Sequence, residues 1–237
     1  MQAENKSDRV NYEKLVAKIA AGDQAYHSET YPKVLSSINK QFLLDVPYEA
    51  YKSKAGHEIE LLRSVFDSTT VHLLDFVGDS ATKAMPGVNG VDLLMLVKRD
   101  LTNQDFYRLV DKGYTFIGLS PFFKAYNDVL YFIKPLSSVK HKTDPAFVTL
   151  HIANKHSDTA FKILNNRRLF NNNPDCIDEL KQRKIAYVNK HKNLNDLETY
   201  HGLCRLEIDY IIEKFNSEEF LRKHSNMSEQ DMKRYLQ

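Results

Sequence analysis

Apolar side chains follow two different periods along this chain, and the change between them divides it into three parts. Over positions 1–46 they recur at i, i+3, i+4 and i+7, which is the spacing of one face of an α-helix. The first series is Tyr12, Leu15, Val16, Ile19 and Ala20. Pro32 suits the first turn of a helix, so we predict that a second helix begins there and extends to Phe42. We expect positions 1–46 to form a helical N-terminal extension, which carries no recognisable chemistry and is a candidate surface for a protein partner.

The middle of the chain changes to the pattern of strands. After a further helical pattern from Pro47 to about Phe66, short apolar runs bounded by turn residues predict strands. These runs cover 71–77, 91–97, 114–118, 129–133 and 147–153. The run 91–97 is apolar on both faces except for Asp92, as expected of a buried central strand. A helix over 102–112, capped by Thr102 or Asn103 and closed by Gly113, is predicted between the second and third strands.

The last third of the chain is helical in pattern. Asn173-Pro174-Asp175 predicts a helix start with Asn as the cap and Pro in the first turn. Asn195 and Glu198 have the spacing of a capping box and predict a last long helix that ends near Phe215. We therefore expect an α+β fold, in which 47–155 form a mixed sheet with flanking helices and 156–237 form a helical part packed on that core.

Composition narrows the possible functions. The chain has 237 residues, of which 42% are hydrophobic and 27% charged, as in a globular protein with a sizeable core. A formal net charge of +2 gives no reason to expect binding to nucleic acid or to a membrane. Cys176 and Cys204 suggest neither a disulfide framework nor a metal site. A polar N-terminus and short apolar runs exclude a signal peptide and a membrane span, so we expect a cytoplasmic protein.

Two polar features of the predicted strands need an explanation. An unpaired buried carboxylate costs several kcal/mol, so Asp92 is either a functional residue with a metal, cation or donor beside it, or a residue at a strand edge near solvent. Gly78 ends a predicted strand and is followed by Asp79, Ser80, Ala81 and Thr82, two of which are small hydroxyl residues. Backbone N–H groups at such a helix start bind anions, but an ordinary strand-to-helix turn has the same sequence.

Basic residues near the C-terminal helices raise the same kind of choice. Lys184 falls near the middle of an apolar face made by Ile177, Leu180 and Val188. It either enters a pocket or meets an acidic partner, or it packs its stem and extends its ammonium to water. His151 lies on the strand face opposite Val148 and Leu150, as a structural residue or as a ligand. The excess of Lys and Arg between 162 and 192 suits phosphate recognition or a solvated surface.

The order of these motifs resembles the GrpB-like family. Gly78-Asp79-Ser80 and Asp92, fourteen residues after the glycine, match a glycine-serine turn followed by a strand aspartate. The other matching segments are Met85-Pro86-Gly87, Leu109 to Tyr114, Thr149 to Ile152, Arg167, Pro174 and Lys184. The resemblance covers roughly Tyr48 to Phe215 and places the chain near the nucleotidyltransferase superfamily.

The resemblance implies a nucleoside triphosphate as substrate and a nucleotidyltransferase-like fold. Gly78 and Ser80 would contact phosphate, and Arg167, Lys184 and His151 would line the nucleotide site. Asp92 would be a catalytic ligand of Mg²⁺ or Mn²⁺, which aligns the triphosphate and activates the attacking hydroxyl. Asp79 is the candidate second ligand.

Several residues depart from the family pattern. Asp79 replaces a serine, Leu94 stands where active members have a second carboxylate, and Val88 and Cys204 each replace a lysine. Two hypotheses follow. The chain is a metal-dependent nucleotidyltransferase with an unknown acceptor, or it is a catalytically inactive relative that binds a nucleotide, another anion or a protein.

Overall fold

The computed structural model describes residues 10–23, 25–119, 128–137 and 139–237, with the backbone alone for 26–28. The helices are α1 (Tyr12–Ala20), α2 (Ala25–Ser36), α3 (Tyr48–Val65), α4 (Asn103–Asp111), α5 (Asp158–Asn172), α6 (Pro174–His191), α7 (Leu197–Phe215), α8 (Glu218–His224) and α9 (Glu229–Leu236). The strands are β1 (Phe42–Leu43), β2 (Val71–Val77), β3 (Gly87–Val88), β4 (Gly90–Val97), β5 (Thr115–Leu119), β6 (Val129–Pro135) and β7 (Phe147–Asn154).

A mixed five-stranded sheet with the order β2-β4-β7-β6-β5 forms the centre of the described part of the chain. β4 and β7 are parallel, and the other neighbouring strands are antiparallel. The register sets Asp92 of β4 opposite Val77 of β2 and Thr149 of β7. His151 lies opposite Tyr131 of β6. The predicted α+β fold with a mixed sheet is therefore confirmed, and Asp92 lies on its second strand rather than at its edge.

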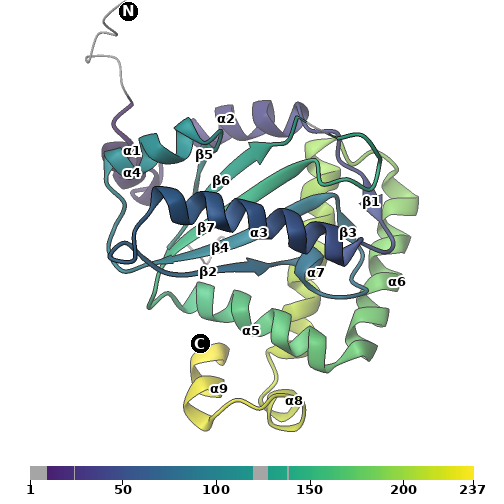
Figure 1. Cartoon of the computed structure of the whole chain (residues 1–237). Helices are drawn as coiled ribbons and strands as arrows, with labels where there is room; N and C mark the ends of the chain where they lie inside the picture. Colours follow the sequence, from purple (N-terminus) through teal and green to yellow (C-terminus); the bar gives the residue numbers. More distant parts are fainter. Residues whose placement is uncertain (1–9, 24, 120–127, 138) are drawn as a thin grey trace, which may run out of the picture.

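The alternation of side chains along the strands gives the sheet two different faces. One face, with Val91, Leu93 and Met95, packs against α1, α3 and α4. In Figure 1, α3 runs across the front of this face and α7 passes behind the sheet. The opposite face carries Asp92 and Leu94 and is covered by α2, α5 and α7. This second face contains the candidate site.

The C-terminal helices extend the structure below the sheet, as Figure 1 shows. α6 and α7 pack together, α8 packs on α7, and α9 packs on α5. Buried aromatic residues from these helices, including Phe170, Tyr210 and Phe215, make a second core. The division of the chain at positions 46 and 155 stays a prediction, as does a protein partner for α1 and α2, which pack against β5.

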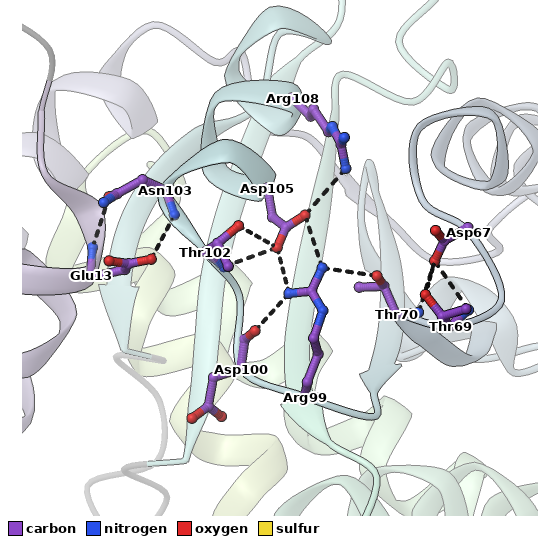
Figure 2. A network of polar contacts seen from close by, with 10 residues as sticks. All are labelled: Glu13, Asp67, Thr69, Thr70, Arg99, Asp100, Thr102, Asn103, Asp105 and Arg108. Carbon is purple, nitrogen blue, oxygen red and sulfur yellow. Dashed lines mark hydrogen bonds and ion pairs between the residues drawn. The ribbon is translucent and has the colours of Figure 1, made fainter.

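Polar contacts fasten α4 to the edge of the sheet (Figure 2). Asp105 is 1% exposed and accepts hydrogen bonds from Arg99 at 2.7 Å and from the Thr102 amide at 2.9 Å. Thr102 and Asp105 together form the capping box of α4. Glu13 and Asn103 exchange two hydrogen bonds of 3.1 Å and so tie α1 to α4. The predicted cap of this helix at Thr102 is confirmed.

Some predicted helix ends are wrong. α2 begins at Ala25 and contains Pro32 in its interior, and Phe42 belongs to a strand because it pairs with Val88. The start of α6 is as predicted, with Asn173 at the cap position and Pro174 in the first turn. The side-chain nitrogen of Asn173, however, donates to the Leu169 carbonyl at 2.7 Å, so the side chain itself does not cap the helix.

The start of α7 also differs from the prediction. The cap is Asp196, whose carboxylate accepts from the Thr199 amide at 2.8 Å. Asn195, which the sequence favoured, accepts instead from the Lys40 amide at 3.1 Å. Among the described residues, none of the helices has the length and apolar character needed to cross a membrane.

Candidate functional site

A cavity of about 180 Å³ lies between the second face of the sheet and the helices α5 and α7. Its walls are mostly apolar and include the rings of Tyr131, Phe147, Phe170 and Tyr200. The polar lining residues that carry the argument are Asp79, Asp92, His151, Arg167 and Glu207. Four of these residues were singled out by the sequence, and they come from the turn after β2 (Asp79), from β4 (Asp92), from β7 (His151) and from α5 (Arg167). The fifth, Glu207, comes from α7.

Asp92 lies at the base of this pocket, and its side chain is 30% exposed. Its Oδ1 accepts a hydrogen bond from the Thr149 hydroxyl on the neighbouring strand and lies 4.0 Å from Nε2 of His151. Burial raises the pKa of Asp92 to about 6, although the bond from Thr149 acts in the opposite direction. Asp92 is therefore largely ionised at neutral pH.

Gly78 approaches Asp92 so closely that no other residue fits at this position. A Cβ atom on Gly78 would lie 2.5 Å from Oδ2 of Asp92, and the backbone has φ of +76°, a conformation that glycine adopts at little cost. A single 3₁₀ turn, Asp79–Ala81, follows in place of the longer helix that the sequence suggested. The amides of Ala81 and Thr82 bond to Gly78 and Asp79 within this turn. These two amides are thus not available to an anion.

Lys184 extends from α6 into the protein and is 1% exposed. Its Nζ donates to Asp79 Oδ2 at 2.7 Å, to Glu207 Oε2 at 2.6 Å and to the Pro86 carbonyl at 3.1 Å. Burial alone would lower the pKa of Lys184, but the two carboxylates raise it above its usual value. Lys184 is therefore a buried, charged residue with acidic partners, and it does not extend to water.

The two carboxylates on Lys184 are not equivalent. Burial and the charge of Glu207 raise the pKa of Asp79 well above the usual carboxyl value. Burial acts in the same direction on Glu207, but Lys184 holds the pKa of Glu207 below its usual value. Burial thus opposes a charge on Asp79, whereas the neighbouring ammonium group stabilises the charge on Glu207.

Arg167 lines the pocket from α5, but its guanidinium is already bound. It makes two parallel bonds to Asp75 of β2, at 2.8 and 3.1 Å, and also donates to the Phe76 carbonyl. Since Arg167 and Lys184 are both held by carboxylates, neither presents an uncompensated positive charge to a phosphate group.

His151 and Ser80 have different positions relative to the pocket. His151 lines it, and burial lowers its pKa to about 4, so the ring is neutral. Its Nδ1 is buried without a hydrogen-bond partner in the part of the chain that the structure describes. Ser80 is buried as well, but it is not among the residues that line the pocket. The arrangement therefore brings His151, but not Ser80, to the site.

The donor atoms do not fit a divalent metal centre of the kind that the resemblance implies. Mg²⁺ requires an octahedral shell of oxygen atoms, and Leu94 fills the next position on the pocket face of β4. Lys184 donates to Oδ2 of Asp79 at 2.7 Å, so its positive charge would oppose that of a metal ion bound to the same carboxylate. Within residues 10–23, 25–119, 128–137 and 139–237, no group of three or more His, Cys, Asp or Glu side chains is placed to hold a metal.

The sequence interpretation missed Glu207, although a signal was present. Glu207 stands four residues after Leu203 and three before Tyr210, both of which are buried, so it lies on the inward face of α7. The same reasoning had identified Lys184 on α6. Three of the departures from the family pattern, Asp79, Val88 and Cys204, also line this pocket, which was not visible from the sequence.

Comparison with known proteins supports the fold. No protein-family model and no curated protein matches the chain. Among solved structures, it is similar to the crystal structure of conserved protein GrpB from Enterococcus faecalis. The TM-score is 0.54 at 15% sequence identity, and the match covers 74% of this chain and 99% of that chain. The chain therefore has a GrpB-like fold.

Proposed function

We propose that this chain is a non-catalytic relative of the nucleotidyltransferase fold that binds a small organic ligand in the pocket between the sheet, α5 and α7. The observation that carries the proposal is the position of Lys184. Its ammonium group bridges Asp79 and Glu207 at 2.7 and 2.6 Å. The ammonium group of Lys184, which the fold holds in place, thus compensates the charge of Asp79. A metal-dependent reaction would need that carboxylate as a ligand of Mg²⁺ or Mn²⁺.

The charge and the size of the pocket also favour this function over binding of a nucleoside triphosphate. A triphosphate needs uncompensated cations or a divalent metal to offset its own negative charge. Among the described residues, Arg167 is the Lys or Arg side chain that lines the pocket, and it is bound by Asp75. Lys184, which lies behind Asp79, is bound by carboxylates as well. The cavity of about 180 Å³ is smaller than the roughly 300–1,000 Å³ of sites for drug-sized ligands. It suits a molecule about the size of a single ring.

Metal-dependent nucleotidyl transfer is a second candidate, and one observation favours it. Asp79 and Asp92 line the same pocket on either side of Gly78. In this function Asp79 would exchange Lys184 for Mg²⁺ or Mn²⁺ and share the metal with Asp92. His151 would then face the bound nucleotide, and the molecule that receives the nucleotide is unknown.

Two assays on the parent and on Asp92→Asn distinguish the candidates. The first measures incorporation of labelled ATP, GTP, CTP or UTP with Mg²⁺ or Mn²⁺. The second measures thermal unfolding with the same additions, because a ligand at a hundredfold excess over its Kd stabilises the fold by about 2.7 kcal/mol. We expect neither incorporation nor a metal-dependent shift. Incorporation by the parent that Asp92→Asn abolishes would instead establish the transferase and overturn the proposal.

A further inference from the structure

The charges around the pocket are unevenly paired. Arg167 is neutralised by Asp75, and the single charge of Lys184 is shared by Asp79 and Glu207. Asp92 has no cation of its own, since its one ion-pair contact in the described residues is the neutral ring of His151 at 4.0 Å. Because the pKa of Asp79 is raised, the uncompensated negative charge at the pocket is that of Asp92, in surroundings that are mostly apolar, where such a charge is costly.

Two buried polar atoms at the pocket also lack partners. Oδ1 of Asp79 and Nδ1 of His151 are buried and accept no hydrogen bond from the described residues. Buried polar atoms in folded proteins nearly always have a partner. Both atoms belong to residues that line the cavity, and a carboxylate oxygen is an acceptor. Since both atoms have almost no accessible surface, the polar group of this wall that a ligand can reach is the carboxylate of Asp92, which is 30% exposed.

We propose that the pocket binds a small organic ammonium ion, whose charged group lies at Asp92 and whose apolar body packs against the aromatic wall. This inference rests on the proposed function and names its class of ligand. The rings of Tyr131, Phe147, Phe170 and Tyr200 suit such an ion because aromatic faces attract cations. An ammonium group supplies up to three hydrogen-bond donors.

An inorganic cation fits these residues less well than an organic one. A metal ion needs several oxygen or nitrogen ligands at fixed distances, which the described residues do not supply. A bare ion has no apolar surface, so an apolar lining does not stabilise it. The apolar body of an organic ion is removed from water by the same lining, which favours its binding. A cavity of about 180 Å³ has room for one ring, since a cavity of about 150 Å³ in another protein holds benzene.

The test uses three probes of nearly equal size and different charge: benzylammonium, benzyl alcohol and benzoate. Their affinities for the full chain are measured by titration followed with two-dimensional NMR. Because a hydrogen bond to a charged group is worth about 1.5–3 kcal/mol, we expect benzylammonium to bind at least about tenfold more tightly than benzyl alcohol. Benzoate should bind more weakly than both. In Asp92→Asn the preference for the cation should be lost.

Two neighbouring isoleucines of α7 control for the location. Ile211 lines the pocket, whereas Ile212 is 55% exposed. Ile211→Trp should block benzylammonium, and Ile212→Trp should leave its affinity unchanged. Equal affinities of the cation and the alcohol would overturn the ligand class while leaving a small-ligand pocket in place. A cation preference that persists in Asp92→Asn, or no benzylammonium binding at millimolar concentration, would also overturn the ligand class. None of these results overturns the non-catalytic function, which nucleotide incorporation would overturn and which a metal site that depends on Asp92 would count against.

Discussion

Replacing Lys184 by Met tests the buried ion-pair cluster on which the account depends. The substitution keeps most of the unbranched side chain, which becomes one atom shorter, but it removes the charge. Asp79 and Glu207 are then left next to each other without a cation. Breaking a buried ion pair by removing one partner costs about 3–5 kcal/mol. Lys184 is 1% exposed and contacts both carboxylates at less than 2.8 Å. We therefore expect Lys184→Met to lower the free energy of unfolding by an amount in this range.

The loss is measured as the free energy of unfolding in urea and as the change in Tm. At about 2–4 °C per kcal/mol for a chain of this size, the expected fall in Tm is roughly 6–20 °C. Because the chain contains no Trp, unfolding is followed by far-UV circular dichroism. Lys190 is an exposed residue of the same helix, and Lys190→Met is expected to change stability by no more than about 0.5 kcal/mol.

A charge-matched variant separates the ion pairs from the packing of the lysine stem. In the triple variant Lys184→Met, Asp79→Asn, Glu207→Gln no charge is left without a partner, so it should be more stable than Lys184→Met alone. Two results would refute the reasoning. One is a Lys184→Met protein as stable as the parent, and the other is a triple variant no more stable than the single one.

Three further predictions concern other parts of the fold, all measured by chemical or thermal unfolding. Gly78→Ala should lower the free energy of unfolding by more than about 1 kcal/mol, because Gly78 has a positive φ and a Cβ there would lie 2.5 Å from the carboxylate of Asp92. The control is Gly56→Ala in α3, where a Cβ meets nothing within 4 Å, and it should raise the free energy of unfolding by up to about 1 kcal/mol. A Gly78→Ala protein as stable as the parent would contradict the prediction. Burial acts to raise the pKa of Asp105, but its bonds to an arginine and a threonine hold that pKa below the usual value. The ionised Asp105 therefore contributes to the free energy of unfolding near neutral pH, and this contribution is lost as the pH falls through the pKa of the folded state. Over this pH range the parent should lose more stability than Asp105→Asn. Identical dependence of stability on pH in the two proteins would contradict this. A Cβ on Gly202 would lie 1.9 Å from the Tyr187 hydroxyl oxygen, so Gly202→Ala should be destabilising and Tyr187→Phe should restore part of the loss; no rescue would show that the strain lies elsewhere.

The five strands of the central sheet could be predicted from the sequence because their signal is local, whereas the two-residue strands β1 and β3 were not predicted. The run Val71–Val77 has the predicted bounds, and Asp92 was recognised as a carboxylate in an otherwise apolar central strand. The spacing of apolar residues on its own helix placed Lys184 on the buried face of that helix, but it left open whether the ammonium group extends to water. In each case the pattern extends over a few turns or strand residues, where side-chain periodicity decides which face is buried.

The partners of these residues could not be predicted, because they depend on contacts between distant parts of the chain. Lys184 meets Asp79, which is 105 positions away in the sequence, and Arg167 is bound by Asp75 of β2. Helix ends were also uncertain where two polar residues compete to cap one helix. Asp196, with an ionised side chain, caps α7, while its neighbour Asn195 bonds to the loop before β1.

The central claim is that a lysine supplied by the fold makes this pocket unsuited to a divalent metal. It is tested most directly by titrating the protein with Mn²⁺ and following the electron paramagnetic resonance signal of the unbound ion, on the parent and on Asp92→Asn. The account predicts that the parent and Asp92→Asn leave the same amount of Mn²⁺ unbound, because the parent has no Mn²⁺ site that depends on Asp92. Stoichiometric binding of Mn²⁺ by the parent that is lost in Asp92→Asn would contradict it and return the pocket to metal-dependent chemistry.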